Sequence, residues 1–299
     1  MKRRVLALLV ALGLALAAGA SGSLELRLGA SYAPAAGFGL EARYAASLLV
    51  SERWGGAFLE AALYPSWNLA SGELEAGLSR LEVGYTAGDL AFGLGAGPEP
   101  LATLHTLAPF ELAQPRFDYA PGLWGAWAEA YPDPDTRLRL ALRLPGGHPA
   151  GIFKAEKRLA RNAYRLALVY GLAPAPAAFG AGFSTRAGSV LLYGEAWHLW
   201  RESAAWRGGA GASFYLLDGL LELEAAYAGG WRLAAGYNFQ PDEDWLAAAL
   251  VRADLPGEAG FSLSLTRLLE EGDVIFELAA RRDAAGVLWL PALSARVYY

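Results

Sequence analysis

The chain of 299 residues contains no cysteine. This absence excludes disulfide bonds, thiolate catalysis and zinc sites with cysteine ligands. Histidine is also scarce, and the three histidines are His105, His148 and His198. These shortages leave little material for metal or nucleophilic chemistry, so we expect no catalytic residue, no cofactor and no metal site.

The sequence also lacks a long apolar run after its N-terminus, although 55% of its residues are hydrophobic. A membrane-spanning helix needs about 20 consecutive apolar residues. A high apolar content without such runs is typical of a chain whose apolar side chains are spread singly over a large lipid-facing surface.

Lysine and methionine are rare as well. The only lysines are Lys2, Lys154 and Lys157, and the chain has one methionine. A low content of thermolabile residues is typical of many thermophile proteins. A GC-rich genome would equally favour alanine, glycine, leucine and arginine, so the composition leaves both explanations open.

The first 20 residues have the pattern of a secretory signal peptide. Lys2, Arg3 and Arg4 form a basic start, residues 5–17 are apolar, and residues 18–20 (Ala-Gly-Ala) supply a small-x-small cleavage pattern. A membrane anchor is the alternative. Cleavage after Ala20 would leave 22 basic against 30 acidic residues and change the net charge from −5 to −8. An acidic mature protein argues against nucleic-acid binding.

Residues 21–299 are predicted to form an all-β domain, because apolar and polar residues alternate with period two almost throughout. Tight-turn residues at 217–219 and 228–230 separate several of the alternating runs, which predicts antiparallel hairpins. We expect an up-and-down barrel of about 16 strands, within a range of 14 to 18. One representative run places Leu138, Leu140, Leu142 and Leu144 on one face, against Arg137, Arg139, Ala141 and Arg143 on the other.

Three stretches depart from this pattern. Residues 65–79 are predicted as a loop with one helical turn, and residues 151–162 as either a strand or a loop. Residues 97–121 contain five prolines and are predicted as a long loop. Long loops without secondary structure are more often functional or disordered.

Aromatic residues near the ends of the predicted strands favour a membrane barrel over a soluble one. Trp231 and Phe239 bound one strand, and eight steps of about 3.3 Å span roughly 26 Å. With the tilt of the strand this length is slightly short of an apolar band of about 25 Å. Trp206, Tyr227, Trp245 and Trp289 also lie near strand ends. Ordinary packing of strand aromatics in a core is the alternative.

The C-terminal strand carries the most specific motif. Leu293, Ala295, Val297 and Tyr299 are apolar at alternate positions, and the chain ends on an aromatic residue. This strand resembles the terminal strand of bacterial outer-membrane β-barrels, in which Phe is the usual last residue. The resemblance implies a porin-like class without a specific family, a place in the outer membrane, and outer-membrane lipid and the barrel-assembly machinery as partners.

If the leucine-rich face meets lipid, the opposite face lines the interior and carries the charges. Such charges need water or ion-pair partners, so they indicate either a channel that selects solutes or a network of structural pairs. The residues expected to line the pore are Arg27, Arg43, Glu60, Arg139, Arg143, Arg165, Arg207, Glu222, Glu224, Arg232, Arg252, Glu277 and Arg296.

The long loop at 97–121 is a candidate constriction, with Glu111, Arg116 and Asp118 near the narrowest point. A surface loop that never enters the interior is the alternative. The aromatic residues Trp127, Trp197, Tyr215 and Tyr298 are also expected to point inward and to narrow an open lumen.

The sequence is compatible with three classes of function. We expect a water-filled channel for passive diffusion of small polar solutes, and a homo-oligomer is left open by class analogy alone. A plugged structural or assembly barrel is the first alternative. An outer-membrane hydrolase is the weakest, because Glu195 and His198 are three residues apart and a regular strand places them on opposite faces.

Overall fold

We describe a computed structural model of the chain. It describes residues 21–33, 37–69, 71–99, 101, 104, 107, 121–172, 177–200, 206–255, 257–283 and 286–298. The expected signal peptide, residues 1–20, lies outside these residues and stays a prediction. The first strand begins at Ser21, directly after the expected cleavage position.

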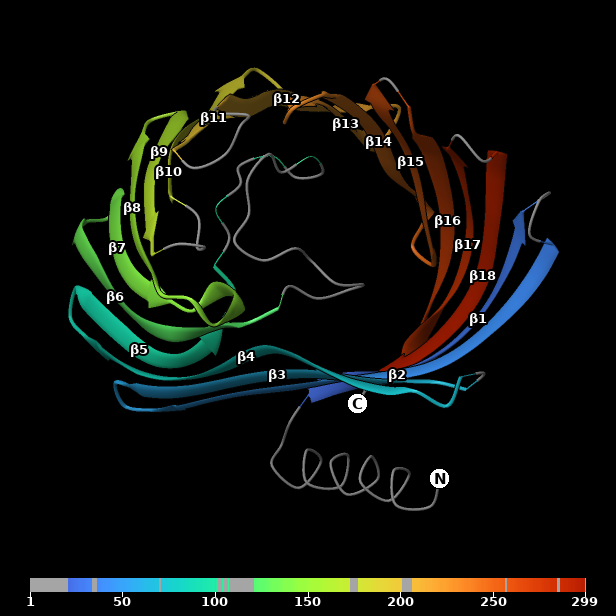
Figure 1. The fold of residues 1–299 in the computed structure, drawn as a ribbon, viewed down its shortest axis with the longest axis horizontal. Helices are drawn as coiled ribbons and strands as arrows, with labels where there is room; N and C mark the ends of the chain where they lie inside the picture. The colour runs from blue at the N-terminus through green and yellow to red at the C-terminus, as the bar shows by residue number, and fades with distance from the viewer. Residues whose placement is uncertain are drawn as a thin grey trace.

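Within the described residues, 18 strands form one antiparallel sheet, and β1 pairs with both β2 and β18, so the sheet closes into a barrel (Figure 1). The all-β barrel predicted from the sequence is confirmed, with a strand number at the top of the expected range. The strands are β1 (Ser21–Ala33), β2 (Gly37–Trp54), β3 (Ala57–Asn68), β4 (Leu74–Ala87), β5 (Leu90–Gly97), β6 (Leu123–Asp133), β7 (Thr136–Arg143), β8 (Ala150–Leu159), β9 (Asn162–Gly171), β10 (Ala177–Ala187), β11 (Val190–Leu199), β12 (Trp206–Leu216), β13 (Gly219–Tyr227), β14 (Trp231–Asp242), β15 (Trp245–Leu255), β16 (Ala259–Leu269), β17 (Gly272–Asp283) and β18 (Gly286–Tyr298).

A single 3-10 turn, η1 (Pro145–Gly147), is the helical element among the described residues. None of the helical structure in the described part of the chain is long and apolar enough to cross a membrane.

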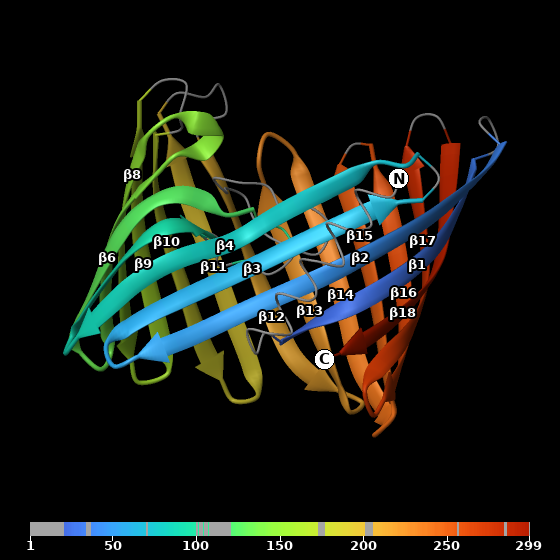
Figure 2. The same ribbon diagram turned by 90° about the horizontal axis from the view of Figure 1, so that it is seen from below.

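The two edges of the barrel differ in their connections. Eight two-residue turns join the strands from β2–β3 to β16–β17 at one edge, which we call the tight-turn edge. Leu217 and Asp218 in one of these turns both have positive φ, 49° and 61°, as a type I′ hairpin requires. The other edge, the loop edge, carries the remaining connections, and the longest is residues 98–122 between β5 and β6. Figure 2 shows the tilted strands between these edges.

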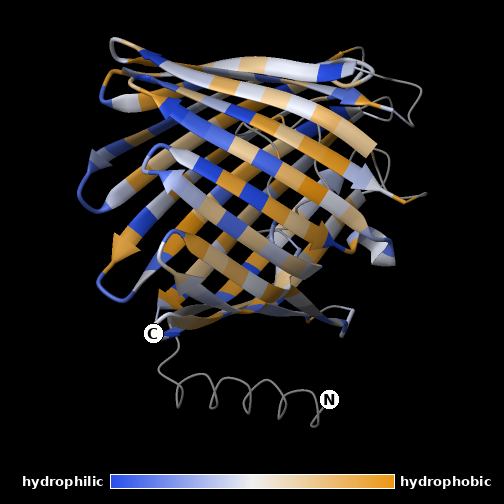
Figure 3. Cartoon of the chain, turned by 90° about the vertical axis from the view of Figure 1, so that its left-hand side faces the viewer, coloured by the Kyte–Doolittle hydropathy of each residue, from blue (hydrophilic) through white to orange (hydrophobic). Residues whose placement is uncertain are grey.

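The outer face of the barrel is apolar. Alternating residues produce the striped hydropathy seen in Figure 3, and the outward residues include Leu140, Leu233 and Leu263, which are 62%, 43% and 46% exposed. In β18, Leu293, Ala295 and Val297 are exposed on this face, whereas Ser294 between them is buried. Tyr299, the last residue of the expected assembly motif, lies outside the described residues.

The aromatic residues near the strand ends lie on the same outer face. Trp206, Tyr227, Trp231 and Trp289 are exposed, and several make cross-strand ring contacts, as Tyr227 does with Trp231. Their exposure fits interfacial girdles and not the packing of a closed core.

One prediction from the sequence is wrong. Residues 65–79 do not form a loop with a helical turn, because β3 continues to Asn68 and β4 begins at Leu74. The physical reason is a β-bulge: Ala62 pairs with Arg80 and Leu63 with Leu78, which leaves Ser79 as an extra residue. The bulge switches the alternation from Leu74–Leu78 to Leu81–Tyr85, so the period-two pattern breaks within a continuous strand. Residues 151–162, left open above, belong to β8, a two-residue turn and the start of β9.

Candidate functional site: the barrel interior

The long connection after β5 enters the barrel. Leu101, Leu104 and Leu107 are 0%, 5% and 4% exposed and pack against inward residues of the strands. Figure 1 shows the described parts of this connection inside the ring of strands. The backbone N–H of Leu104 donates to Glu195 Oε1 at 3.1 Å, and that of Leu107 donates to Glu224 Oε2 at 2.7 Å. We call the described residues Pro98, Glu99, Leu101, Leu104 and Leu107 the infolded segment. Of the two positions that the sequence left open for this connection, these residues occupy the inward one.

The infolded segment runs along the inner wall instead of across it. Glu195 lies near the middle of β11 and Glu224 near the middle of β13. The segment therefore passes from β5 to β13 halfway between the two edges. A connection at this height reduces the open cross-section of the barrel on one side.

Two apolar clusters attach the infolded segment to the wall. Leu101 packs among small and branched residues of β7 to β11, including Ile152 and Val169. Leu104 and Leu107 pack against Tyr193 and small residues of β13 and β14. Burial of this apolar surface, at roughly 25 cal/mol per Å², favours the inward position over a solvated loop.

A single carboxylate anchors the start of the segment. Glu99 accepts from Lys154 Nζ at 2.7 Å, Arg139 Nη2 at 2.8 Å and Arg143 Nε at 3.1 Å, and its side chain is fully buried. Burial raises the pKa of the Glu99 carboxyl, but Lys154 and Arg139 outweigh that effect and hold the pKa at about 2. We call Glu99, Arg139, Arg143 and Lys154 the Glu99 centre.

Neighbouring carboxylates complete the charge balance of this centre. Arg139 Nη1 donates to Glu129 at 2.5 Å, and Arg143 Nη2 donates to Glu82 at 3.0 Å. Arg143 also donates to the carbonyl oxygen of Leu123 at 3.1 Å. Buried charges are tolerated when they are paired and hydrogen-bonded in this way.

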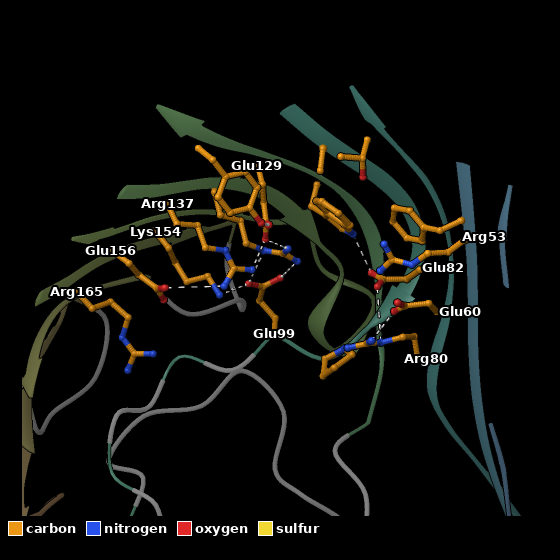
Figure 4. Close-up of a pocket in the computed structure, with 17 residues that line it drawn as sticks. Arg53, Glu60, Arg80, Glu82, Glu99, Glu129, Arg137, Lys154, Glu156 and Arg165 are labelled. Atoms are coloured by element: carbon orange, nitrogen blue, oxygen red, sulfur yellow. Dashed lines mark hydrogen bonds and ion pairs between the residues drawn. The ribbon is translucent and has the colours of Figure 1, made fainter. Parts of the chain in front are cut away.

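A cavity of about 380 Å³ opens from the Glu99 centre toward the tight-turn edge. Figure 4 shows its wall, where carboxylates and guanidiniums alternate, with Arg80 bound to Glu60 at 2.5 Å. Two aromatic side chains, Phe58 and Trp127, belong to the same wall. The cavity therefore offers a polar surface of paired charges together with a small aromatic surface.

A second cavity, of about 820 Å³, lies on the loop-edge side of the infolded segment, and Leu107 and Leu250 form part of its wall. Its charged residues come from β1 and from β14 to β17 with the connection before β16: Arg27, Arg232, Arg252, Asp254, Glu258 and Arg281. The infolded segment thus lies between two polar chambers, one toward each edge of the barrel.

The residues predicted to line the pore lie on the inner face. Ten of them keep part of their surface exposed within the barrel: Arg27, Arg43, Glu60, Arg165, Arg207, Glu222, Arg232, Arg252, Glu277 and Arg296. Several are in ion pairs, such as Arg27 with Glu277 at 2.5 Å and Arg296 with Glu25 at 3.0 Å.

The other three need a correction. Arg139, Arg143 and Glu224 face inward but are only 9%, 0% and 5% exposed, because the infolded segment and its partners cover them. They hold the segment, and of the three only Arg139 also reaches the wall of the first cavity. The expected constriction residues Glu111, Arg116 and Asp118 lie outside the described residues, so their place at the narrowest point stays a prediction.

The aromatic residues that were expected to narrow the lumen lie in different places, and Trp127 lines the first cavity. Trp197 lies flat over Gly180, where a Cβ atom would come within 2.4 Å of the indole, and it is buried beneath the infolded segment. Tyr215 and Tyr298 are 75% and 46% exposed at the tight-turn edge.

Sequence reasoning missed two residues of the Glu99 centre. Glu99 stands between two prolines in a stretch without periodicity, so no strand pattern assigned it to the inner face. Lys154 lies in the stretch that was left open between strand and loop. Lys154 lies opposite Arg139 in the β7–β8 ladder. If residues 151–162 had been assigned as a strand, this pairing would have placed Lys154 on the inner face.

The glutamate and histidine that were considered for a hydrolase do not come together in the structure. His198 contacts the ring of Trp206 at 4.7 Å, whereas Glu195 faces the interior, so the two lie on opposite faces as expected. His105 lies outside the described residues. Among the residues searched, no group of three or more histidine, aspartate or glutamate side chains is arranged to hold a metal ion.

A closed antiparallel barrel with an apolar outer belt, a charged inner face and a connection folded into its interior defines a porin-like β-barrel. Solved structures with this fold include Pseudomonas aeruginosa OccK8 (OprE), with a TM-score of 0.68, 9% identity, and coverage of 94% of this chain and 98% of that chain. A second is Pseudomonas aeruginosa OccK2 (OpdF) in complex with glucuronate, with a TM-score of 0.67, 12% identity, and coverage of 93% of this chain and 97% of that chain. A third is Acinetobacter baumannii OccAB4, with a TM-score of 0.67, 8% identity, and coverage of 94% of this chain and 98% of that chain. No family model matches the chain, and the comparison with curated proteins found no match.

Proposed function

We propose that this chain is an outer-membrane channel through which small polar solutes diffuse passively. The observation that carries the proposal is the pair of polar cavities, of about 380 and 820 Å³, on either side of the infolded segment. A large barrel leaves an aqueous channel when nothing fills its interior. The apolar outer belt supplies the surface that lipid would cover.

The comparisons support the same function. The solved structures compared above are Occ and Opd outer-membrane porins, and one of them, OccK2, was solved with glucuronate, a small polar solute. The inner charges of this chain are largely paired, so we expect weak ion selectivity. The mature protein would begin at Ser21, and the barrel-assembly machinery would read Leu293, Ala295, Val297 and Tyr299.

The test is conductance of the purified, refolded protein in planar lipid bilayers. We expect discrete single-channel steps, and a larger conductance after deletion of residues 102–113. This deletion removes Leu104 and Leu107 but leaves Glu99 and Leu101 in place. A Glu195→Ala, Glu224→Ala double variant tests the same point without shortening the chain. It removes the two carboxylates that accept hydrogen bonds from the backbone N–H groups of Leu104 and Leu107, and it should also raise the conductance.

The plugged structural barrel is the second candidate, and the two apolar clusters beneath the infolded segment favour it. It predicts no conductance in either the full chain or the deletion variant. Unchanged conductance after the deletion would instead leave the channel in place and remove the constriction from it.

A further inference from the structure

Four residues stand directly opposite one another across neighbouring strands at the tight-turn half of the barrel. Phe58 of β3 pairs with Gly84 of β4, Gly84 with Gly93 of β5, and Gly93 with Trp127 of β6. Aromatic rings at the two ends of this row therefore flank two glycines that have no side chain.

The two rings lean toward each other over the glycines. A Cβ atom on Gly84 would come within 2.3 Å of the Phe58 ring, and one on Gly93 within 2.7 Å of the Trp127 indole. The ring centroids are 6.2 Å apart and the planes differ by 25°. One face of each ring lies against glycine backbone, and both rings are half-buried. We call Phe58 and Trp127 the aromatic platform, and both residues line the cavity.

Paired charges surround the platform. Trp127 Nε1 donates to Glu82 at 3.0 Å, and the guanidinium of Arg139 lies over the indole, 4.7 Å from its centroid. Because Gly93 and Arg139 occupy the two faces of the indole, the ring of the platform that is left for a ligand is that of Phe58. Among the described residues that line the cavity, every cation except Arg53 is in an ion pair with a carboxylate: Arg80, Arg137, Arg139, Lys154 and Arg165. The rim of the platform thus offers donors and acceptors side by side with little excess charge.

We propose that the aromatic platform binds the pyranose ring of a monosaccharide during its passage, an inference that rests on the proposed channel. The negative face of an aromatic ring attracts the polarised C–H groups on one face of a sugar ring. A hydroxyl group donates and accepts at once, so it matches a carboxylate–guanidinium pair. A small inorganic anion would bind better where cations are unpaired, and an apolar ligand would leave the charged rim without water. The cavity falls within the usual range of small-molecule sites, about 300–1,000 Å³.

The test compares three solutes on the refolded full chain. Glucose has the ring, glucuronate has the ring and a charge, and sorbitol has the hydroxyl groups on an open chain. We expect glucose and glucuronate to reduce the single-channel current saturably, and sorbitol to reduce it only in proportion to its concentration. The difference between the two sugars reports the contribution of charge, including Arg53.

Two variants alter the platform in different ways. Phe58→Leu removes one ring, and Gly93→Ala keeps both rings but places a methyl group beneath Trp127. Each should weaken half-maximal inhibition by glucose about tenfold, the equivalent of about 1.4 kcal/mol. Tyr215→Leu, an aromatic substitution at the exposed tight-turn edge, is the control and should leave glucose inhibition unchanged. Single-channel steps in each variant show that the barrel has folded.

Isothermal titration of the detergent-solubilised protein with glucose separates this inference from the proposed function. Saturable heat in a protein that shows no conductance would refute the channel and keep the platform. Conductance with equal effects of glucose and sorbitol, or with glucose inhibition unchanged in Phe58→Leu, would refute the platform and keep the channel.

Discussion

The Glu99 carboxylate connects the infolded segment to cations on two strands, Arg139 and Arg143 of β7 and Lys154 of β8. Arg139 and Arg143 have a second carboxylate, Glu129 and Glu82 respectively. Lys154 forms a salt bridge to Glu99 as well. Removing the charge of Glu99 therefore leaves all three cations without this shared carboxylate in a buried place.

We predict that Glu99→Gln destabilises the barrel. Breaking a buried ion pair by removing one partner costs about 3–5 kcal/mol, so the urea midpoint of the protein in detergent should fall clearly. Glu277→Gln is the matched control, because the side chains of its partner Arg27 and of Glu277 are 42% and 35% exposed, and exposed pairs contribute about 0–1 kcal/mol. Equal midpoints for the two variants would contradict the structural role of Glu99.

The Glu99 centre also predicts a pH dependence. The pKa of Glu99 in the folded barrel is about 2, below its ordinary value of 4.5. Its stabilising contribution is therefore complete above pH 4.5 and is lost as the pH falls toward 2. We expect the current to be steady from pH 7 to about 4.5 and to change only under stronger acid, as the anchor of the segment weakens. The same titration of Glu99→Gln should lack the change that Glu99 causes.

At the scale of the strand, alternation decides which side chains meet lipid and which meet water. Cysteine substitutions test this without background, because the chain has no cysteine of its own. We predict fast modification by a water-soluble reagent at Arg252→Cys and Glu222→Cys, and protection in liposomes at Leu140→Cys and Leu233→Cys. Arg139→Cys should react more slowly than Arg252→Cys, because Arg139 is covered by Glu99. Equal rates at all five positions would contradict the assignment of faces.

A charge on the lipid face should be costly. Leu140 lies within β7 and is 62% exposed on the outer surface. Leu140→Arg is expected to cost about 2–4 kcal/mol if the residue lies near the bilayer midplane. The refolding equilibrium in lipid vesicles measures this cost, and Leu140→Ala corrects for the lost leucine. A cost near zero would place Leu140 at the interface or outside the membrane.

The sequence predicted the strands wherever the period-two pattern was uninterrupted, as at residues 138–144. It failed at residues 65–79, because the extra residue Ser79 shifts the pattern by one position and Pro65 and Gly72 imitate a loop. The Glu99 centre was beyond such reasoning. Its members become neighbours only through the path of a non-periodic connection inside a closed barrel, and alternation carries no information about that path.

For the whole molecule, the barrel has an acidic net charge, an apolar belt and a polar interior. We predict that the protein is recovered in the outer-membrane fraction with Ser21 as its N-terminus, as N-terminal sequencing would show. Circular dichroism of the extracted protein should be dominated by strand. A soluble periplasmic product, or a start at Met1, would contradict the export and insertion that we propose.

The seam between β1 and β18 has a consequence for how the molecule forms. Arg296 and Glu25, which are bonded across this seam at 3.0 Å, are 271 positions apart in the chain. Contacts of such long sequence separation form slowly. The two ends of the chain lose conformational entropy when they meet, and the hydrogen bonds between them offset this loss only afterwards. Until then, β1 and β18 are both open edges that invite pairing with other chains. The nascent protein is therefore most prone to aggregation just before closure, and a chaperone that shields these two strands would protect it through that interval.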